Sequence, residues 1–309
     1  MKAFEEIERA RTPSGSVLTI GTFDGVHRGH RHIISRVAQE ARDNGLQAGV
    51  LTFTTTPREV FQPDAPISNL SSLDERIGLL KEAGADYVVP VTFDRDLAGV
   101  SAHDFARQLV DVLSMRRLVV GPDFAMGRRR EGTIPVLTEI GQELGFTVLP
   151  MEELQDGGQR IGSSVIRSLL IDDGNVAAAN YMLARPYGLS GTVQEGHKRG
   201  KDLGFPTANI SVPTRRAVPA DGIYVTRAHL GDRVLQSVTN IGDNPTFHDD
   251  ERMIETFILD FDEEIYGQTI GVEFLARLRG EVEFTTVDAL VDQMRIDVQQ
   301  TRAYFTQNP

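Results

Sequence analysis

The sequence has 309 residues, of which 40% are hydrophobic and 25% charged, with a formal net charge of −12 and no cysteine. This length predicts two domains rather than one, and the acidic balance argues against nucleic-acid binding, which requires a basic surface. The lack of cysteine excludes disulfides and thiolate sites.

The first half of the sequence alternates strand-like and helix-like segments. Apolar runs predict strands at 17–20, 46–53, 87–93, 117–121 and 146–151, and periodic segments predict helices at 30–44, 73–83, 102–114 and 133–144. Asp74 and Ser101 are expected helix starts, and Gly45, Gly84 and Gly145 are expected stops. The alternation predicts an α/β domain with a Rossmann-like parallel sheet, whose ligands bind beyond the carboxyl ends of the strands.

The pattern changes after Ala184, where Arg185-Pro186-Tyr187 follow a helical stretch at 176–183. Turns rich in Gly, Pro and Asp separate short strand-like runs, which predict an antiparallel barrel or sandwich; the runs are 188–193, 222–229, 234–240, 254–261 and 269–278. In the tail, helical periodicity predicts one apolar face made of Val287, Leu290, Val291, Met294 and Val298. We therefore expect two domains, 1–184 and 185–309.

No membrane or secretory segment is expected. No apolar run approaches the roughly 18 residues that cross a bilayer, and residues 1–12 are charged where a signal peptide has an apolar core. We expect a cytoplasmic protein with no membrane partner and no nucleic-acid partner.

A glycine-rich turn with two histidines follows the first predicted strand, and residues 21–30 read Gly-Thr-Phe-Asp-Gly-Val-His-Arg-Gly-His. Such a turn lets backbone N–H groups approach a phosphate, and the helix start adds partial positive charge. His27 and His30 lie on the same side of that helix start and can donate hydrogen bonds to charge that develops on phosphorus. This arrangement suits nucleotidyl transfer. Asp24 is either part of it or a turn former.

A second segment suited to phosphate lies at Ser163-Ser164. These serines can cap the helix that follows. With Arg167 one turn later, they can also hold an anion. The sequence leaves both readings open.

A third segment runs from Gly196 to Asn209 and begins with a basic loop that includes Lys201. Two glycines bracket the loop, which can fold over phosphates. Thr207 and Asn209 offer neutral oxygen ligands to Mg²⁺ that already carries ATP oxygens, although Asn209 also suits a turn. A fourth candidate is Glu255, which lies in a strand that reads as apolar on both faces. A carboxylate there is either used or paired, or it faces water at a strand end.

Together these segments resemble the prokaryotic bifunctional riboflavin kinase/FMN adenylyltransferase (FAD synthetase) family, from about Val17 to Tyr304. The turn at 21–30 and Leu-Gly-Phe-Pro-Thr-Ala-Asn at 203–209 are the most specific matches, and further matches lie at 120–124, 130–132, 185–187, 240–247, 266–267 and 278–279. The resemblance implies that 1–184 is a nucleotidyltransferase α/β domain that makes FAD and pyrophosphate from FMN and ATP. It implies that 185–309 is a six-stranded riboflavin kinase barrel with a terminal helix, which makes FMN and ADP from riboflavin and ATP.

The resemblance also implies residue roles. In the adenylyltransferase, His27 and His30 would steady the ATP phosphates, and the other ATP-binding residues would be Gly21, Phe23, Gly29, Asp123, Ser163, Ser164 and Arg167. In the kinase, Glu255 would accept the proton of the ribityl 5′-hydroxyl, and Arg279 would lie near the flavin. ATP would be bound there with Mg²⁺ by Gly196, Lys201, Thr207 and Asn209, of which the last two would hold the metal.

Three positions depart from the family pattern. Thr54–Thr56 stand where the family often has a histidine, Gly162 replaces a serine, and Lys201 stands where arginine is common. Two alternatives follow. One is a riboflavin kinase with a weak or vestigial adenylyltransferase domain. The other is a non-catalytic flavin or nucleotide sensor, against which Thr207, Asn209 and Glu255 argue.

Overall fold

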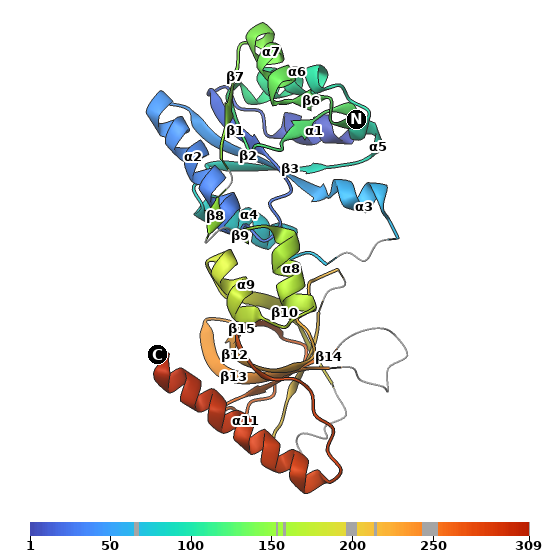
Figure 1. Ribbon diagram of the computed structural model, residues 1–309, viewed down its shortest axis with the longest axis vertical. Helices are drawn as coiled ribbons and strands as arrows, with labels where there is room; N and C mark the ends of the chain where they lie inside the picture. The colour runs from blue at the N-terminus through green and yellow to red at the C-terminus, as the bar shows by residue number, and fades with distance from the viewer. Residues whose placement is uncertain are drawn as a thin grey trace. The chain divides into compact units, whose positions relative to one another are not determined.

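The computed structural model describes residues 1–64, 68–152, 154–156, 159–195, 203–212, 215–242 and 253–308. The chain divides into two compact units, Met1–Ser163 and Ser164–Pro309 (Figure 1). Each unit has its own main sheet, parallel in the first unit and antiparallel in the second. The boundary between activities at 184 and 185 stays a prediction.

A five-stranded parallel sheet forms the first unit. Its strands are, in spatial order, β3 (Tyr87–Thr92), β2 (Gln47–Thr55), β1 (Ser16–Ile20), β4 (Met115–Val120) and β7 (Thr147–Pro150). Every residue of β1 is buried, as expected of a central parallel strand covered on both faces. The strand order reverses between β1 and β4, so the carboxyl ends of these two strands flank a binding crevice.

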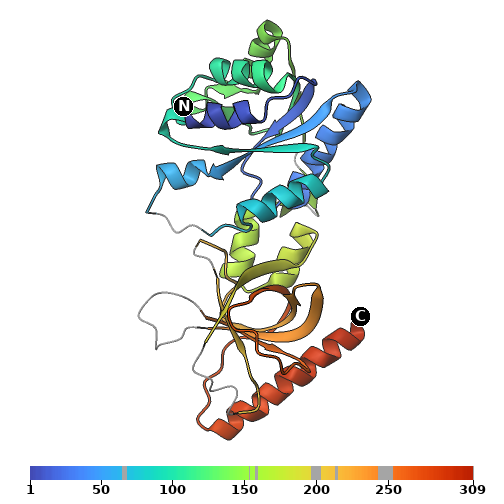
Figure 2. The same cartoon turned by 180° about the vertical axis from the view of Figure 1, so that it is seen from behind.

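Helices cover both faces of this sheet (Figures 1 and 2). One face packs against α1 (Lys2–Arg9), α6 (Ala102–Leu113) and α7 (Ile134–Leu144). The other face packs against α2 (Arg28–Asn44) and α4 (Leu73–Glu82). Shorter elements occupy the connections: α3 (Pro57–Phe61), α5 (Arg95–Ala98), η1 (Arg128–Arg130), β5 (Ala125–Met126), β6 (Gly132–Thr133), β8 (Gln155–Asp156) and β9 (Gln159–Arg160).

The strands and helices predicted for this half are confirmed, with ends that shift by no more than two residues. Ser101 caps α6 as predicted, but α4 is capped by Ser72 rather than starting at Asp74, because Ser72 and Glu75 form a capping box. Gly45 and Gly145 end their helices in the left-handed conformation. Helix α1 was not predicted, because only Ala3 and Ile7 of its charged sequence are buried.

Six antiparallel strands close into a barrel in the second unit. Around the barrel they are β10 (Tyr187–Gln194), β11 (Ala208–Ser211), β14 (Met253–Ile258), β13 (Arg233–Gly242), β12 (Gly222–Leu230) and β15 (Thr269–Arg279). Helices α8 (Ser163–Ile171) and α9 (Val176–Leu183) precede the barrel in sequence. Asn180 of α9 donates to the Phe274 carbonyl at 2.8 Å and accepts the Tyr187 N–H at 2.7 Å, so α9 is bonded to two barrel strands.

Buried hydroxyls and aromatic rings share the inside of the barrel. Thr226 bonds Ser237 and Thr239 at 2.7 and 2.8 Å, and Thr239 bonds Thr256 at 2.9 Å, so each of these four buried hydroxyls has a partner. The alternate residues of β12 and β13 face outward, where α11 (Val287–Gln307) crosses them (Figure 1).

The predicted face of the terminal helix needs correction at Val287. Val287 is 61% exposed, and the buried residues of α11 are Asp297, Thr301 and Phe305. Leu290, Val291, Met294 and Val298 are partly buried and lie on the same side of the helix as these residues, so apolar periodicity found the face but not its polar members, Asp297 and Thr301.

Candidate active sites

The turn after β1 fixes His27 at the start of α2. His27 is the N-cap of this helix, and its Nδ1 accepts the main-chain N–H of His30 at 3.3 Å. Phe23 and Val26 have φ angles of 50° and 41°, and Gly25 between them has 78°, so the turn is wound in the left-handed region. Because Nδ1 is an acceptor, a neutral His27 carries its proton on Nε2, which is a hydrogen-bond donor for a ligand.

His30 stacks on His27, with ring centroids 3.6 Å apart and planes inclined by 20°. Burial, and then the neighbouring His27 and Arg76, hold the pKa of His30 well below its usual value, so the ring is neutral at pH 7. The residue keeps some exposed surface, but its Nδ1 is buried and has no hydrogen-bond partner among the described residues. A bound ligand would supply that partner.

Asp24 anchors this turn to the segment at residues 70–71. Its carboxylate is buried and accepts the N–H groups of Leu70 at 2.9 Å and Ser71 at 3.0 Å, and the Ser71 hydroxyl at 3.1 Å. The guanidinium of Arg76 lies 3.7 Å away, and the Gly25 N–H donates to Ser71 Oγ at 3.0 Å. Asp24 therefore does more than form a turn, because it ties residues 70–71 to the histidine segment.

Two more predicted residues meet at this turn. Ser163 Oγ donates to the Asp24 carbonyl at 2.9 Å, which brings residues far apart in sequence together. A Cβ on Gly29 would lie 3.2 Å from the His27 ring, so glycine permits the close approach of ring and helix. Ser164 and Arg167 follow in the second unit, and their predicted contact with a triphosphate stays a prediction.

Asp123 lies in the loop after β4, three residues beyond the end of that strand. Its side chain is exposed, and its carbonyl accepts Nη2 of Arg130 at 2.8 Å. Arg129 and Arg130 have φ angles of 54° and 60°, so the short η1 segment is held in an unfavourable backbone conformation. The Arg130 bond ties a basic cluster, Arg128–Arg130, to the loop that follows β4.

Sequence analysis missed an aromatic group at the carboxyl ends of β2 and β3. The Phe93 ring meets the rings of Phe53 and Phe61 edge-on, with centroids 5.6 and 5.9 Å away, and Phe61 is 63% exposed. Thr56 and Glu59 form a capping box that starts α3, which carries Phe61. That capping box was the sequence signal from which α3 could have been predicted. An exposed ring at the carboxyl edge of the sheet suits contact with a planar ligand.

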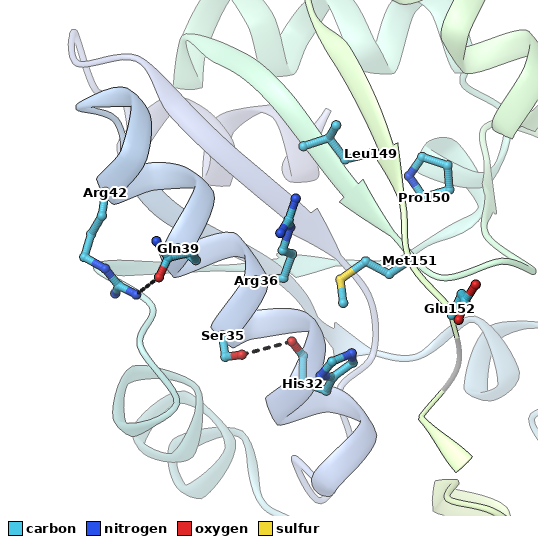
Figure 3. A pocket seen from close by; sticks show the side chains of 9 residues that line it. All are labelled: His32, Ser35, Arg36, Gln39, Arg42, Leu149, Pro150, Met151 and Glu152. Atoms are coloured by element: carbon cyan, nitrogen blue, oxygen red, sulfur yellow. Dashed lines mark hydrogen bonds between the residues drawn. The ribbon is translucent and has the colours of Figure 1, made fainter.

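A pocket of about 580 Å³ lies between α2 and the end of β7 (Figure 3), lined by His32, Ser35, Arg36, Gln39, Arg42, Leu149, Pro150, Met151 and Glu152. Arg42 donates to Gln39 at 2.8 Å, and Arg36 pairs with Glu40. The pocket begins two residues after His30 and continues along α2. No predicted site residue lines it, so it neighbours the histidine turn without being part of it.

In the second unit, strand register brings predicted kinase residues onto one face of the barrel. Asn209 of β11 lies opposite Glu255 of β14, and Glu255 lies opposite Asn240 of β13. Asn240 pairs with Ile223 of β12, which pairs with Arg279 at the end of β15. Cross-strand partners point to the same face. We call the five residues Asn209, Glu255, Asn240, Ile223 and Arg279 the barrel row.

Glu255 differs from the sequence expectation in its surroundings. Ile254, Thr256 and Ile258 are buried, whereas Glu255 and Phe257 are partly exposed, so the strand alternates instead of being buried on both faces. An asparagine stands opposite Glu255 on each side. Amide groups at these positions suit the orientation of a carboxylate. Asn240 was not predicted, because a single sequence does not reveal strand register.

The expected metal ligands are Thr207, one residue before β11, and Asn209 in it. The part of the chain that the structure describes contains no cluster of three or more His, Cys, Asp or Glu suited to a metal ion. A site made of hydroxyl and amide oxygens fits a Mg²⁺ that takes most of its ligands from ATP and water. Gly196 and Lys201 lie outside the described residues.

Known proteins match both halves of the chain. The family model for FAD synthetase matches residues 9–165, and that for riboflavin kinase matches residues 183–305. A bifunctional riboflavin kinase/FMN adenylyltransferase of Escherichia coli K12 is 39% identical over 294 residues, which cover 94% of this chain and 93% of the relative. The protein of the same name from Bacillus subtilis is 34% identical over 296 residues, again covering 94% and 93%.

A solved structure also matches nearly the whole chain. It is a Streptococcus pneumoniae protein named as a macrolide-efflux protein, with 31% identity and a TM-score of 0.90 over 98% of this chain and 97% of that one. Among the described residues here, no helix is long and apolar enough to span a membrane. The two family models and the relatives that span the chain show that it belongs to the bifunctional riboflavin kinase/FMN adenylyltransferase family.

Proposed function

We propose that the two units divide the two steps of flavin cofactor synthesis. The chain phosphorylates riboflavin with ATP to give FMN and ADP, and it transfers the adenylyl group of a second ATP to FMN to give FAD and pyrophosphate. Residues 1–184 carry the adenylyl transfer and residues 185–309 the phosphorylation. The observation that carries this assignment is the presence of two distinct sites, the histidine turn in one unit and the barrel row in the other.

In adenylyl transfer, a phosphate oxygen of FMN attacks the α-phosphorus of ATP, the bond from this phosphorus to the bridging oxygen breaks, and pyrophosphate leaves. His27 donates from Nε2 to the phosphates, and the neutral His30 contributes its unpartnered Nδ1. Hydrogen bonds that stabilise charge in the transition state provide most of the acceleration in such reactions. The exposed Phe61 provides a surface for the flavin ring.

In phosphorylation, the ribityl 5′-oxygen attacks the γ-phosphorus of ATP, its proton passes to a Glu255 oxygen, and ADP leaves. Asn209 and Asn240 stand on either side of Glu255 and orient its carboxylate. Thr207 and Asn209 would hold Mg²⁺, which neutralises phosphate charge when bound. Gly196 and Lys201 belong to the same proposed ATP site, and Arg279 lies near the flavin.

The matches span both units, so they give no support to a vestigial first domain or to a non-catalytic sensor. We place the enzyme in the cytoplasm, where ATP is available for both steps.

Product analysis tests the function directly. The chain is incubated with riboflavin, ATP and Mg²⁺, and separately with FMN, ATP and Mg²⁺, and the flavins are separated by chromatography. We expect FMN followed by FAD in the first mixture, and FAD with an equal amount of pyrophosphate in the second. A chain that makes FMN but never FAD would support a riboflavin kinase with a vestigial adenylyltransferase domain. A chain that makes neither product would support a non-catalytic sensor.

A further inference from the structure

Arg279, at one end of the barrel row, is held by a buried carboxylate of the terminal helix. Its Nε donates to Asp297 Oδ1 at 3.0 Å, and its Nη2 donates to Oδ2 at 2.7 Å. The Asp297 side chain is only 5% exposed and that of Arg279 is 20% exposed. This two-point geometry fixes both the place and the plane of the guanidinium.

Further contacts complete the arrangement around this pair. Gln293, one turn earlier in α11, donates to Asp297 Oδ1 at 2.9 Å. Nη1 of Arg279 donates to the Gly280 carbonyl at 3.0 Å, and the Phe284 ring centre lies 6.0 Å from Arg279 Cζ. A guanidinium has five N–H donors, and these bonds use three of them. The other two, one on Nη1 and one on Nη2, have no partner among the described residues.

The attachment of α11 to the barrel does not depend on this pair alone. Arg302 of α11 makes a second two-point bond, to Asp260 at 2.8 and 2.7 Å, on the exposed surface. Phe305 is buried beside Arg227. A buried ion pair stabilises a fold no better than apolar residues of the same shape. The pair of Arg279 and Asp297 instead fixes the position of the Arg279 side chain, which belongs to the barrel row.

We propose that Asp297 is a positioning residue of the riboflavin kinase, which acts through Arg279 to set where riboflavin binds. This rests on the proposed function, in which Glu255 accepts the 5′-hydroxyl proton and Arg279 lies near the flavin. The two remaining N–H groups of Arg279 donate to carbonyl oxygens of the flavin ring. From Glu255 to Arg279 the row crosses three strand spacings of about 4.8 Å each, so one end of riboflavin is anchored while the other meets the base.

The central test is Asp297→Asn, which keeps the shape of the side chain and removes its charge. We expect the KM for riboflavin to rise about tenfold, the size of one lost charge-assisted hydrogen bond, while the KM for ATP and the kcat stay within twofold. FAD formation from FMN by the same chain is the internal measure of active protein. The matched control is Asp260→Asn, which breaks the other two-point pair of α11 and leaves the KM for riboflavin unchanged.

A second pair of variants separates the proposal from the function on which it rests. Arg279→Met should raise the KM for riboflavin, and the double variant Arg279→Met with Asp297→Asn should be no worse, because both act through one guanidinium. If Arg279→Met leaves this KM unchanged, the placement of Arg279 at the flavin is wrong. If Arg279→Met raises it but Asp297→Asn does not, or if the two effects multiply, the positioning role of Asp297 is wrong.

A milder variant covers the case in which Asp297→Asn does not fold. Gln293→Leu removes one hydrogen bond to Asp297 and keeps the ion pair. We expect a two- to threefold rise in the KM for riboflavin, about half the free energy of the larger change. No change in this variant, with normal FAD formation, would overturn the proposal.

Discussion

The two candidate sites are built in opposite ways. The histidine turn is local, because its stacked rings, its helix cap and its left-handed backbone all lie within residues 21–30. The barrel row is assembled from five strands, and its members are spread from residue 209 to residue 279. A local site is sensitive to the few side chains that support one turn, whereas an assembled site depends on strand register and on whatever holds its ends.

The largest effect on the local site is expected from Asp24→Asn. The substitution puts an amide where Leu70 and Ser71 donate, and it leaves the buried Arg76 beside a neutral group. Loss of one partner from a buried pair costs about 3 kcal/mol or more in the free energy of unfolding. Denaturant unfolding measures this, and FAD formation should fall with it. The control Glu82→Gln breaks an exposed pair with Arg31 and should change stability by less than about 0.5 kcal/mol.

Gly29→Ala should separate geometry from stability. The added Cβ would lie 3.2 Å from the His27 ring and displace it. Alanine also favours helix, so we expect unchanged or slightly higher stability with a roughly tenfold fall in the rate of FAD formation. Steady-state kinetics with FMN and ATP measure the fall. A Cβ on Gly162 meets nothing within 4 Å, so Gly162→Ala is the control and should leave the rate of FAD formation unchanged. A normal rate in Gly29→Ala would show that FAD formation does not depend on the position of the His27 ring.

Phe61→Ala tests the proposed flavin surface. Because Phe61 is 63% exposed, its loss should hardly affect folding. We expect about a fivefold increase in the KM for FMN in FAD formation, the range of a lost aromatic contact. The KM for ATP in that step and the KM for riboflavin in the kinase step should not change. An equal increase for all three substrates would place Phe61 outside the flavin site.

The smallest effect concerns pH. The pKa of His30 is lowered in the folded chain, so between that pKa and the unfolded value of about 6.5 the unfolded chain binds the extra proton. The stability of the first unit is therefore complete above pH 6.5 and declines as the pH falls toward the folded pKa. Thermal unfolding from pH 7.5 to 5 should show this decline in the native chain and less of it in His30→Gln. Equal declines of stability in the native chain and in His30→Gln would contradict the assignment of this pH dependence to His30.

The contrast between a local site and an assembled site also explains which features could be predicted from the sequence. Periodicity and glycine punctuation located the strands and helices of the first unit, because each of these signals acts over a few residues. The histidine turn was found for the same reason. Asn240 and Asp297 were not found, because they join the barrel row through register and through a helix that packs back on the barrel. Phe61 was not found, because the capping box of Thr56 and Glu59 predicts a helix start but not that Phe61 lies against Phe93.

The most direct test of two separate sites is a crossed measurement in one chain. His30→Ala and Glu255→Gln are each assayed for FMN formation from riboflavin and for FAD formation from FMN, with the native chain as reference. We expect Glu255→Gln to lower FMN formation by about 10²-fold or more with FAD formation intact, and His30→Ala to do the reverse. A variant that lowers both steps equally, while its unfolding matches that of the native chain, would contradict the division.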